Sequence, residues 1–306
     1  MTKSKISILI VGGTGFIGYH LAKESLNKGW SVTSLSSRRP KKIRFLKKVK
    51  YIICDIGKKR SLDKKIKKSF TYVVNLGGYV DHSKRKKTFN SHYLGCKNLS
   101  EIFLKKYPKC FLQIGSSGEY GKIKSPQKET YKCRPISVYG KAKFLASKHL
   151  VTLFKRKKFP SVILRLYQIY GPNQDFNRFI PAIIRGCLNN ERFPCSAGTQ
   201  LRDFLYIKDL TNAIFKSLGS KKAIGQIINV GSGKPKKIKE IILKIKKILK
   251  KGYPQFGKIK LREDEGFKIY PTIKKAKKQI KWKPKISFEK GLKRTIKSYL
   301  QRKIGA

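Results

Sequence analysis

Two residues in the stretch SVYGKAK have the types and the spacing needed for proton transfer. Tyr139 and Lys143 lie four residues apart, so on a helix both side chains occupy one face. A lysine ammonium near a phenol stabilises the phenolate, and we expect it to lower the pKa of Tyr139 toward the working pH. The pair would then move a proton on and off an alcohol or sugar hydroxyl. In a chain this rich in lysine, the same spacing also arises by chance on an exposed helix.

A hydroxyl group that could share the same substrate oxygen follows the apolar run 110–115. Ser116 and Ser117 stand at the carboxyl end of this predicted strand, where open α/β sheets bind their ligands. The Ser116 hydroxyl would hydrogen-bond the oxygen that Tyr139 protonates. Its alternative role is to cap or turn the chain.

A glycine-rich stretch, VGGTGFIGYH at 11–20, follows the first apolar run. Gly12 permits a tight turn, Gly15 lets the backbone approach a pyrophosphate, and Gly18 lets a helix pack closely on the strand. Backbone N–H groups and the positive end of the helix dipole then face the anion. The spacing is G-x-x-G-x-x-G rather than the commoner G-x-G-x-x-G, and a turn without a ligand would use the same residues. Its position between a strand and a helix favours a dinucleotide site.

The end of the second predicted strand indicates which dinucleotide binds. An acidic residue is expected here for the adenosine ribose, but the chain has Ser36 and Ser37, followed by Arg38 and Arg39. Arginine suits a 2′-phosphate, and the missing carboxylate removes a repulsion against it. The pattern favours NADP(H), with NAD as the alternative; the two arginines are otherwise members of a generally basic surface.

The elements that must position these residues alternate regularly. Helical stretches, among them 17–28 and 88–106, separate short apolar runs at 6–11, 31–35, 51–53, 72–76, 110–115 and 161–166. Strands that alternate with helices form a parallel sheet covered on both faces. The predicted fold class is therefore α/β, a Rossmann-like doubly wound parallel sheet with a smaller C-terminal substrate-binding lobe.

The strict alternation ends near residue 171, which predicts a two-part organisation. Residues 1–170 would form the dinucleotide-binding domain, and 203–231 would return to it. Residues 171–306 would mainly form the substrate-binding lobe, with a lysine-rich helix at 238–251, and a ligand would lie in the cleft between the two parts. In a last helix, 288–299, apolar residues at 288, 292, 296 and 299 indicate packing.

Composition limits the class of protein. Of 306 residues, 74 are Lys or Arg and 16 are Asp or Glu, a formal charge of +58 that would attract anions. The lysines recur along the whole chain rather than in one arm, which a general compositional bias explains as well as a nucleic-acid partner does. The six cysteines show neither a C-x-x-C pair nor metal-type spacing with histidines, so we expect a cytoplasmic protein without a metal. We expect no signal peptide and no membrane span.

An ordered series of motifs resembles the NAD-dependent epimerase/dehydratase family, extended short-chain dehydrogenases/reductases that act on nucleotide sugars. The series covers nearly the whole chain: GGTGFIG, CDI at 54–56, VVNLGG at 73–78, IGSSGEYG at 114–121, SVYGKAK, ILRLYQIYGP at 163–172, RDFLYIKDL at 202–210, NVGSG at 229–233 and WKP at 282–284.

This resemblance assigns roles to individual residues. Ser116, Tyr139 and Lys143 would form the catalytic set. Tyr139 and Lys143 would also bind the cofactor, Lys143 at the nicotinamide ribose. Arg202 and Arg262 would bind the diphosphate of the substrate, which two forked guanidinium groups suit well. The cofactor would be held at its pyrophosphate by Gly12, Gly15, Phe16, Ile17 and Gly18, at its adenine by Asp55 and Ile56, and along the path to the nicotinamide by Leu76 and Gly77.

The chain departs from the family at several positions. Dehydratases place an Asp-Glu pair after the catalytic hydroxyl, where this chain has Ser117 and Gly118, so we do not expect water elimination. His92 replaces an asparagine in the helix after NLGG, and we expect it to pack inside this helix rather than bind a ligand. Gln168 replaces an asparagine near the substrate phosphates.

The sequence thus predicts an NAD(P)-dependent enzyme that carries out 4-keto reduction or 4-epimerisation of a nucleoside-diphosphate hexose, with Tyr139 as acid and base. A homodimer is the expectation at the level of the family, and we expect neither a membrane nor a nucleic acid as partner. Two alternatives stay open. One is a non-catalytic, basic RNA-binding member of the same fold, and the other is a reductase of a non-sugar carbonyl, against which Arg202 and Arg262 argue.

Overall fold

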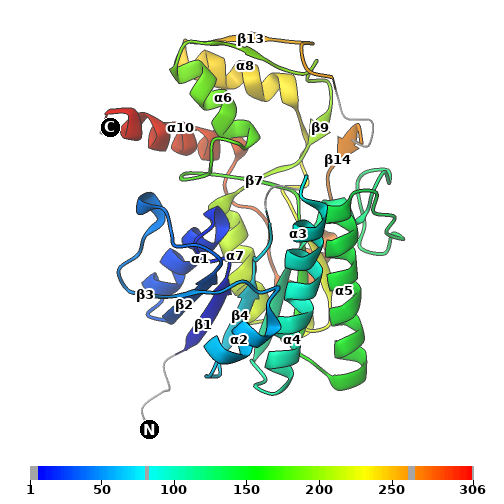
Figure 1. Cartoon of the computed structure of the whole chain (residues 1–306). Coiled ribbons are helices and arrows are strands. Elements are labelled where there is room, and N and C mark those ends of the chain that lie inside the picture. Colours follow the sequence, from blue (N-terminus) through cyan, green and yellow to red (C-terminus); the bar gives the residue numbers. More distant parts are fainter. Residues whose placement is uncertain (1–5, 80–82, 261–265, 305–306) are drawn as a thin grey trace.

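A sheet of seven parallel strands forms the base of the molecule (Figure 1). This computed structural model describes residues 6–79, 83–260 and 266–304. The strand order is β11-β6-β5-β4-β1-β2-β3, which confirms the predicted Rossmann-like α/β class. The strands are β1 (Ser7–Val11), β2 (Ser31–Ser36), β3 (Val49–Ile53), β4 (Tyr72–Asn75), β5 (Cys110–Ser116), β6 (Ser161–Leu166) and β11 (Ile227–Val230).

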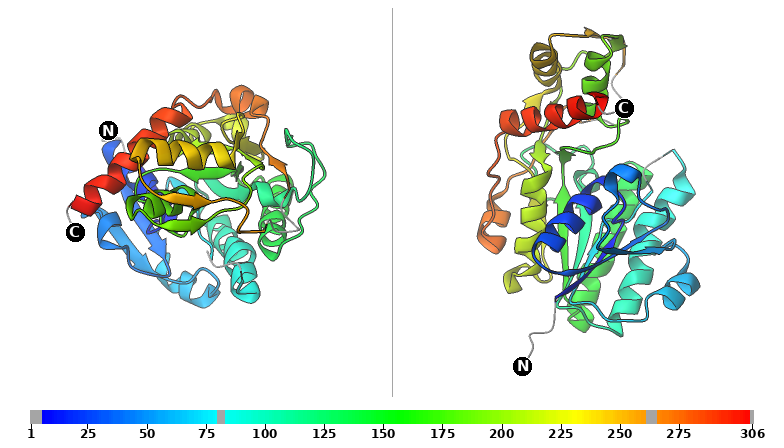
Figure 2. Two further views of the ribbon diagram at one scale, coloured as in Figure 1. Left: turned by 90° about the horizontal axis from the view of Figure 1, so that it is seen from above. Right: turned by 90° about the vertical axis from the view of Figure 1, so that its left-hand side faces the viewer.

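Both faces of the sheet are buried, because successive strand residues point to opposite sides. Ile8 and Ile10 of β1 join one apolar cluster, whereas Leu9 and Val11 join another. Helices α1 (Phe16–Asn27) and α7 (Ile207–Leu218) cover the first face, and α4 (Gly95–Leu104) and α5 (Val138–Lys157) cover the second. Figure 2 shows α7, in yellow-green, and α4, in cyan, on opposite sides of the sheet. Each fully buried aliphatic side chain contributes about 1.5–3 kcal/mol to folding.

The helical stretch predicted at 88–106 is interrupted. It consists of α3 (Arg85–Phe89), a π-helical turn η2 (Asn90–Leu94) and α4. Such turns accommodate one extra residue and occur frequently at functional sites. The apolar periodicity does not reveal it because one inserted residue shifts the pattern by a single position. The turn matters here because it contains His92.

A smaller lobe lies above the carboxyl edge of the sheet (Figure 1). Its helices α6 (Phe179–Leu188), α8 (Ile238–Leu249) and α10 (Phe288–Ile304) accompany short strands that form three small sheets. In α10 the residues Phe288, Leu292, Ile296 and Tyr299 are buried, as the spacing predicts. The small sheets are β7 (Gln168–Tyr170) with β10 (Phe204–Tyr206); β9 (Leu201–Arg202) between β12 (Lys236–Lys237) and β14 (Lys268–Ile269); and β8 (Arg192–Pro194) with β13 (Tyr253–Gln255).

Five further helices in the described part of the chain are short. They are η1 (Lys42–Arg44), α2 (Lys59–Lys65), η3 (Ser117–Glu119), η4 (Lys221–Ala223) and α9 (Lys274–Ile280). Among the described residues, no helix has the length and the apolar character needed to span a bilayer.

Polar contacts join the later part of the chain to the sheet. Strand β11 pairs with β6, so residues 227–230 extend the large sheet. The buried Asp203 carboxylate accepts hydrogen bonds from the backbone N–H groups of Ser232 and Gly233, both at 2.7 Å. On the opposite side, the Arg44 guanidinium donates to the Asn173 carbonyl and to Asp175. These contacts fix the lobe above the edge where the loops of the sheet emerge.

Candidate active site

The glycine-rich loop forms a cradle between β1 and α1. Gly12 has a φ of +79°, which favours glycine, and its N–H donates to the Leu35 carbonyl at 2.7 Å. A Cβ atom added to Gly18 would lie 2.3 Å from the Gly12 oxygen, so only glycine allows α1 to approach the loop this closely. Gly15 precedes the first turn of α1, which has no side-chain cap. The helix begins with Phe16 and Ile17, and its N-terminus has the arrangement that binds phosphate groups.

The residues expected around the rest of the cofactor follow the carboxyl ends of β3 and β4. Ile56, after β3, is buried, and its Cδ1 atom lies where Cβ atoms at Gly77 and Gly95 would come within 2.8 and 2.6 Å. Asp55 is exposed and accepts a hydrogen bond from the Gly57 N–H at 2.8 Å. The Leu76 N–H donates to the Val11 carbonyl at 2.9 Å. The structure therefore brings these residues to one edge of the sheet.

The basic residues after β2 divide into two kinds. Arg38 and Arg39 are exposed at the carboxyl end of the strand, and Ser36 is buried, with its hydroxyl accepting from the Thr14 N–H of the glycine loop at 3.3 Å. Arg44, in contrast, is buried and bonded to the segment 173–175. Arg38 and Arg39 thus lie next to the glycine-rich loop with their side chains in solvent.

The catalytic candidates meet where β5 ends and α5 begins. Ser137 caps α5, its hydroxyl accepting from the Gly140 N–H at 3.1 Å. A Cβ atom at Gly140 would lie 2.4 Å from the Gly118 oxygen, so the turn after β5 packs directly on the first turn of α5. This close approach brings Ser116 near Tyr139, because a Cβ atom at Gly118 would lie 3.4 Å from Ser116 Oγ and 3.7 Å from Cδ1 of the Tyr139 ring. The structure thereby joins two residues that lie 23 positions apart in the sequence.

Lys143 lies one helical turn after Tyr139 and is 3% exposed. Its ammonium group donates to the Ile114 carbonyl at 2.7 Å and lies 6.0 Å from the centre of the Tyr139 ring. Burial lowers the pKa of Lys143 to about 8, while the nearby Glu119 acts in the opposite direction. The lysine is therefore held against β5 as well as beside the tyrosine.

The expectation that Lys143 lowers the pKa of Tyr139 is wrong for the protein groups alone. Burial raises the pKa of Tyr139, and the hydrogen bond from Ser116 opposes this rise. The physical reason is that removing the phenolate from water outweighs the favourable contacts around it. Among the latter, Ser116 contributes most, and Arg178 contributes a smaller favourable charge.

His92 contacts the catalytic candidates from the π-helical turn. It is 6% exposed, and its ring lies edge-on to the Tyr139 ring, with 4.9 Å between the ring centres. A Cβ atom at Gly78 would overlap the imidazole at 1.8 Å, so the glycine makes room for the histidine. His92 is therefore a packing residue of its helix, as predicted. The residue against which it packs is Tyr139.

The two arginines proposed for the diphosphate differ in what the structure describes. Arg202 lies in β9, buried, and its guanidinium donates to the carbonyl groups of Leu201 at 2.9 Å and Phe267 at 3.1 Å. It belongs to a small sheet of the upper lobe rather than to the large sheet. Arg262 lies outside the described residues, in the segment just before Phe267.

Sequence reasoning missed a buried ion pair beneath Ser116. Glu119 and Arg165 form it at 2.9 Å, with side chains that are 0% and 3% exposed. A signal was available, since VILRL places one arginine inside a fully apolar strand, where a charge requires a partner. What the sequence lacks is the identity of this partner, which lies 46 residues earlier.

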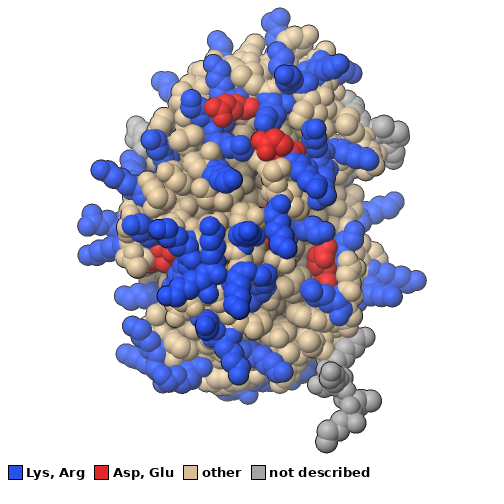
Figure 3. Space-filling model, turned by 180° about the vertical axis from the view of Figure 1, so that it is seen from behind, with Lys and Arg blue, Asp and Glu red and all other residues tan. Residues whose placement is uncertain are grey.

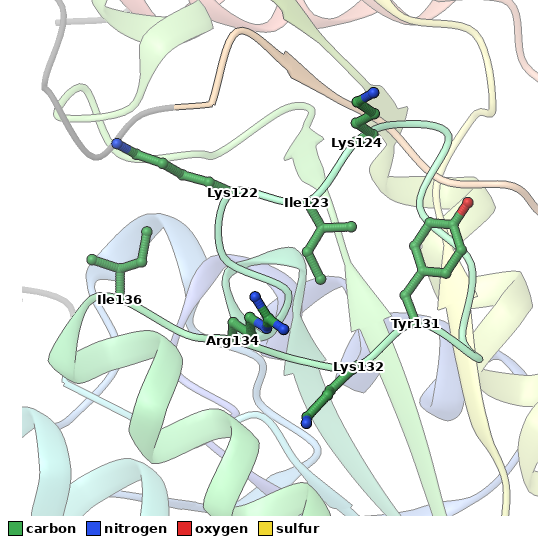
Figure 4. A pocket seen from close by; sticks show the side chains of 7 residues that line it. All are labelled: Lys122, Ile123, Lys124, Tyr131, Lys132, Arg134 and Ile136. Carbon is green, nitrogen blue, oxygen red and sulfur yellow. The ribbon is translucent and has the colours of Figure 1, made fainter.

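An open hollow of about 700 Å³ lies beside the loop that joins η3 to α5 (Figure 4). Lys122, Lys124 and Lys132 point away from one another around it, so their charges do not converge on one point. None of the residues predicted from the sequence to be catalytic, to bind the cofactor or to bind the substrate lines this hollow. Among the described residues, no group of His, Cys, Asp and Glu has the arrangement of a metal site.

The sheet order and the glycine cradle define a dinucleotide-binding protein of the Rossmann type. The chain matches the NAD dependent epimerase/dehydratase family over residues 8–231 and belongs to it. UDP-N-acetyl-alpha-D-glucosaminuronate decarboxylase of Bacillus cytotoxicus is 28% identical, over 94% of this chain and 96% of that protein. A bifunctional UDP-glucose and UDP-xylose 4-epimerase of Pisum sativum is 24% identical, over 94% of each.

A solved structure resembles this chain over nearly its full length. It is UDP-glucuronic acid 4-epimerase of Bacillus cereus, in complex with UDP-glucuronic acid and NAD. The TM-score is 0.87 at 25% identity, and the match covers 97% of this chain and 100% of the other.

Because Lys143 is buried, we expect it to make the free energy of unfolding depend on pH. Below pH 8 the charged ammonium is buried in the folded chain. Between pH 8 and 10.5 the unfolded chain keeps a proton that the folded chain releases. The free energy of unfolding of the parent should therefore rise relative to that of Lys143→Met by about 1.4 kcal/mol per pH unit in this range. Urea denaturation at several pH values measures this. Exposed Lys141→Met is the matched control, and a pH-independent difference for Lys143→Met would contradict the prediction.

Proposed function

We propose that the chain is an NAD(P)-dependent oxidoreductase of nucleotide sugars that catalyses 4-epimerisation of a nucleoside-diphosphate hexose. The observation that carries the proposal is the meeting of Ser116, Tyr139 and Lys143 at the sheet edge where the glycine cradle opens. Relatives that are UDP-sugar 4-epimerases support it.

The cradle fits the pyrophosphate of a dinucleotide. Its fit rests on an uncapped helix N-terminus and on glycines whose Cβ atoms would close the loop. We propose that the dinucleotide is held by Gly12, Gly15, Phe16, Ile17 and Gly18 at the pyrophosphate, by Asp55 and Ile56 at the adenine, and by Leu76, Gly77 and Lys143 on the nicotinamide side. When bound, the nicotinamide supplies hydride transfer with the sugar carbon.

The residues of the chain supply proton transfer and orientation. The Ser116 hydroxyl polarises the oxygen on C4 of the sugar. Tyr139 takes the proton of the C4 hydroxyl group as C4 is oxidised. After the keto sugar has turned its opposite face toward the hydride donor, Tyr139 returns the proton to the oxygen on C4. Lys143 adds positive charge beside the phenolate. Arg202, together with Arg262, is proposed to bind the diphosphate, as forked guanidinium groups do.

A second candidate reaction is 4-keto reduction with NADPH, and a specific observation favours it. Arg38 and Arg39 lie exposed at the end of β2, next to Ser36, where no carboxylate would repel a 2′-phosphate. The same three catalytic residues would serve. Water elimination has less support, because Ser117 and Gly118 provide neither an acid nor a base.

Replacing the catalytic tyrosine tests the proposal. Tyr139→Phe should lower turnover of the nucleotide sugar by about 10²–10⁴-fold, since the proton loses its carrier. Cofactor affinity should remain within about twofold of the parent, because the pyrophosphate cradle does not involve Tyr139. NMR of the product and cofactor fluorescence measure the two quantities. Tyr253→Phe, at a residue 54% exposed, is the control. Unchanged turnover in Tyr139→Phe would refute the assignment.

Cofactor titration decides between the two dinucleotides. The reductase alternative predicts that NADPH binds at least about tenfold more tightly than NADH, corresponding to one charge-assisted contact with the 2′-phosphate. Arg38→Ala should remove this preference and leave NADH binding unchanged. Lys47→Ala, the loss of another exposed cation, is the matched control. NAD that stays tightly bound and does not exchange with added dinucleotide would instead favour the epimerase, which keeps a resident cofactor.

The alternative of RNA binding depends on the charge of +58. Figure 3 shows Lys and Arg spread over the visible face from one end to the other rather than gathered in one groove. The RNA hypothesis predicts tight binding that weakens steeply with salt. Filter binding at near-physiological salt that is no tighter than for another lysine-rich protein would count against it.

Two further expectations remain proposals. A homodimer follows from the family, and sedimentation at a monomer mass would contradict it. A cytoplasmic location is supported by six cysteines that are free thiols, and fractionation of cells tests it.

A further inference from the structure

We propose that Glu119 is a positioning residue, which fixes the backbone of Ser116 and thereby aims the Ser116 hydroxyl at Tyr139. Arg165 holds the Glu119 carboxylate in place. This inference rests on the proposed function, in which Ser116 donates a hydrogen bond to the reacting oxygen. Glu119 itself touches neither substrate nor cofactor in this proposal.

In the turn after β5, Glu119 fixes the backbone of Ser116. Glu119 is fully buried, and its Oε1 atom accepts a hydrogen bond from the Ser116 backbone N–H at 2.9 Å. In return, the Ser116 hydroxyl accepts from the Gly118 N–H at 3.1 Å. This reciprocal arrangement is a capping box, which fixes the direction of the chain at the start of a helix. The Gly118 N–H fills one of the two acceptor positions of the hydroxyl oxygen, and the hydroxyl proton remains available for the neighbouring Tyr139.

The second carboxylate oxygen is fixed from the neighbouring strand. The Nε atom of Arg165 donates to Oε2 of Glu119 at 2.9 Å, and the guanidinium stacks 4.6 Å from the centre of the Tyr120 ring. Arg165 stands opposite Gly115 in the pairing of β5 and β6. A Cβ atom at Gly115 would lie 2.5 Å from Oε1 of Glu119. A glycine, a glutamate and an arginine are thus fitted to one another beneath Ser116.

Several charged and titratable groups face the Glu119 carboxylate. They come from β6 (Arg165), from α5 (Tyr139, Lys143 and the hydroxyl of Ser147) and from the loop that precedes α5 (Cys133). Burial raises the pKa of Glu119, and Arg165 is the strongest opposing influence. The negative charge of Glu119 raises the pKa of both Lys143 and Tyr139. Removing this charge should therefore lower both.

The test compares three variants of the full chain. Glu119→Gln removes the charge at nearly constant volume, Glu119→Asp keeps it but shortens the reach, and Glu119→Val with Arg165→Met replaces the pair by apolar side chains. The double variant is expected to fold, because well-packed apolar residues often replace a buried ion pair without loss of stability. Exposed Glu240→Gln is the matched control. Thermal unfolding and cofactor titration establish that each variant is folded and binds the dinucleotide.

We expect kcat to fall about 10- to 100-fold in Glu119→Gln and in the double variant, the range for a misplaced catalytic group. KM and cofactor affinity should stay within about twofold, and Glu119→Asp should recover part of the rate. Because Tyr139 must be deprotonated to accept a proton, the acidic limb of the pH–kcat profile should move to lower pH in Glu119→Gln. A loss of kcat without a change in KM or cofactor affinity, partly recovered in Glu119→Asp, is the pattern that a purely structural role would not produce.

Specific outcomes would overturn the proposal. Parent-like kcat in the folded double variant would show that Ser116 needs no such support. If the double variant fails to fold, a parent-like kcat in folded Glu119→Gln would be sufficient to reject the role. A loss of cofactor affinity that accounts for the whole loss of rate would also reject it. If instead Tyr139→Phe keeps full turnover in the same assay, the proposed function has failed.

Discussion

The common direction of the seven strands is the constraint on which the site depends. Every strand pairing in the large sheet is parallel, so all carboxyl ends meet at one edge. Both faces are covered by helices, which leaves this edge as the place where polar groups reach a ligand. Backbone hydrogen bonds such as Gly12 N–H to Leu35 O and Leu76 N–H to Val11 O continue the ladder into the loops. The first residues of the cradle and of the loop after β4 are therefore hydrogen-bonded to the sheet.

This constraint explains how much the sequence could predict. Strands buried on both faces appear as unbroken apolar runs, and their alternation with helices defined the sheet and placed Ser116 at its edge. The proximity of Gly118 and Gly140 could not be predicted, because a glycine shows only that a close approach is possible. The ion pair of Glu119 and Arg165 joins positions 46 residues apart. The pKa of Tyr139 depends on burial, which no spacing in the sequence measures.

The scarcity of acidic residues gives each buried one a clear structural role. Only 16 residues are Asp or Glu, and three buried ones accept backbone N–H groups at junctions. Glu119 does so at Ser116, Asp203 at Ser232 and Gly233, and Asp209 at Lys285 and Ile286. On the face shown in Figure 3, Lys and Arg cover a much larger area than Asp and Glu do. Because the buried contacts are shielded from solvent, salt that screens the surface charges should affect them little.

The upper lobe and the catalytic loop are joined through backbone hydrogen bonds. Gln127, in the loop between Ser116 and Tyr139, donates its N–H to the Tyr270 carbonyl at 2.8 Å and accepts from the Thr272 N–H at 3.0 Å. The segment of Tyr270 continues β14, which pairs with the strand of Arg202. A displacement of the proposed diphosphate site would therefore reach the loop that leads into α5. Under the proposed function, this path connects the part of the lobe that would bind the substrate to the loop that precedes Tyr139.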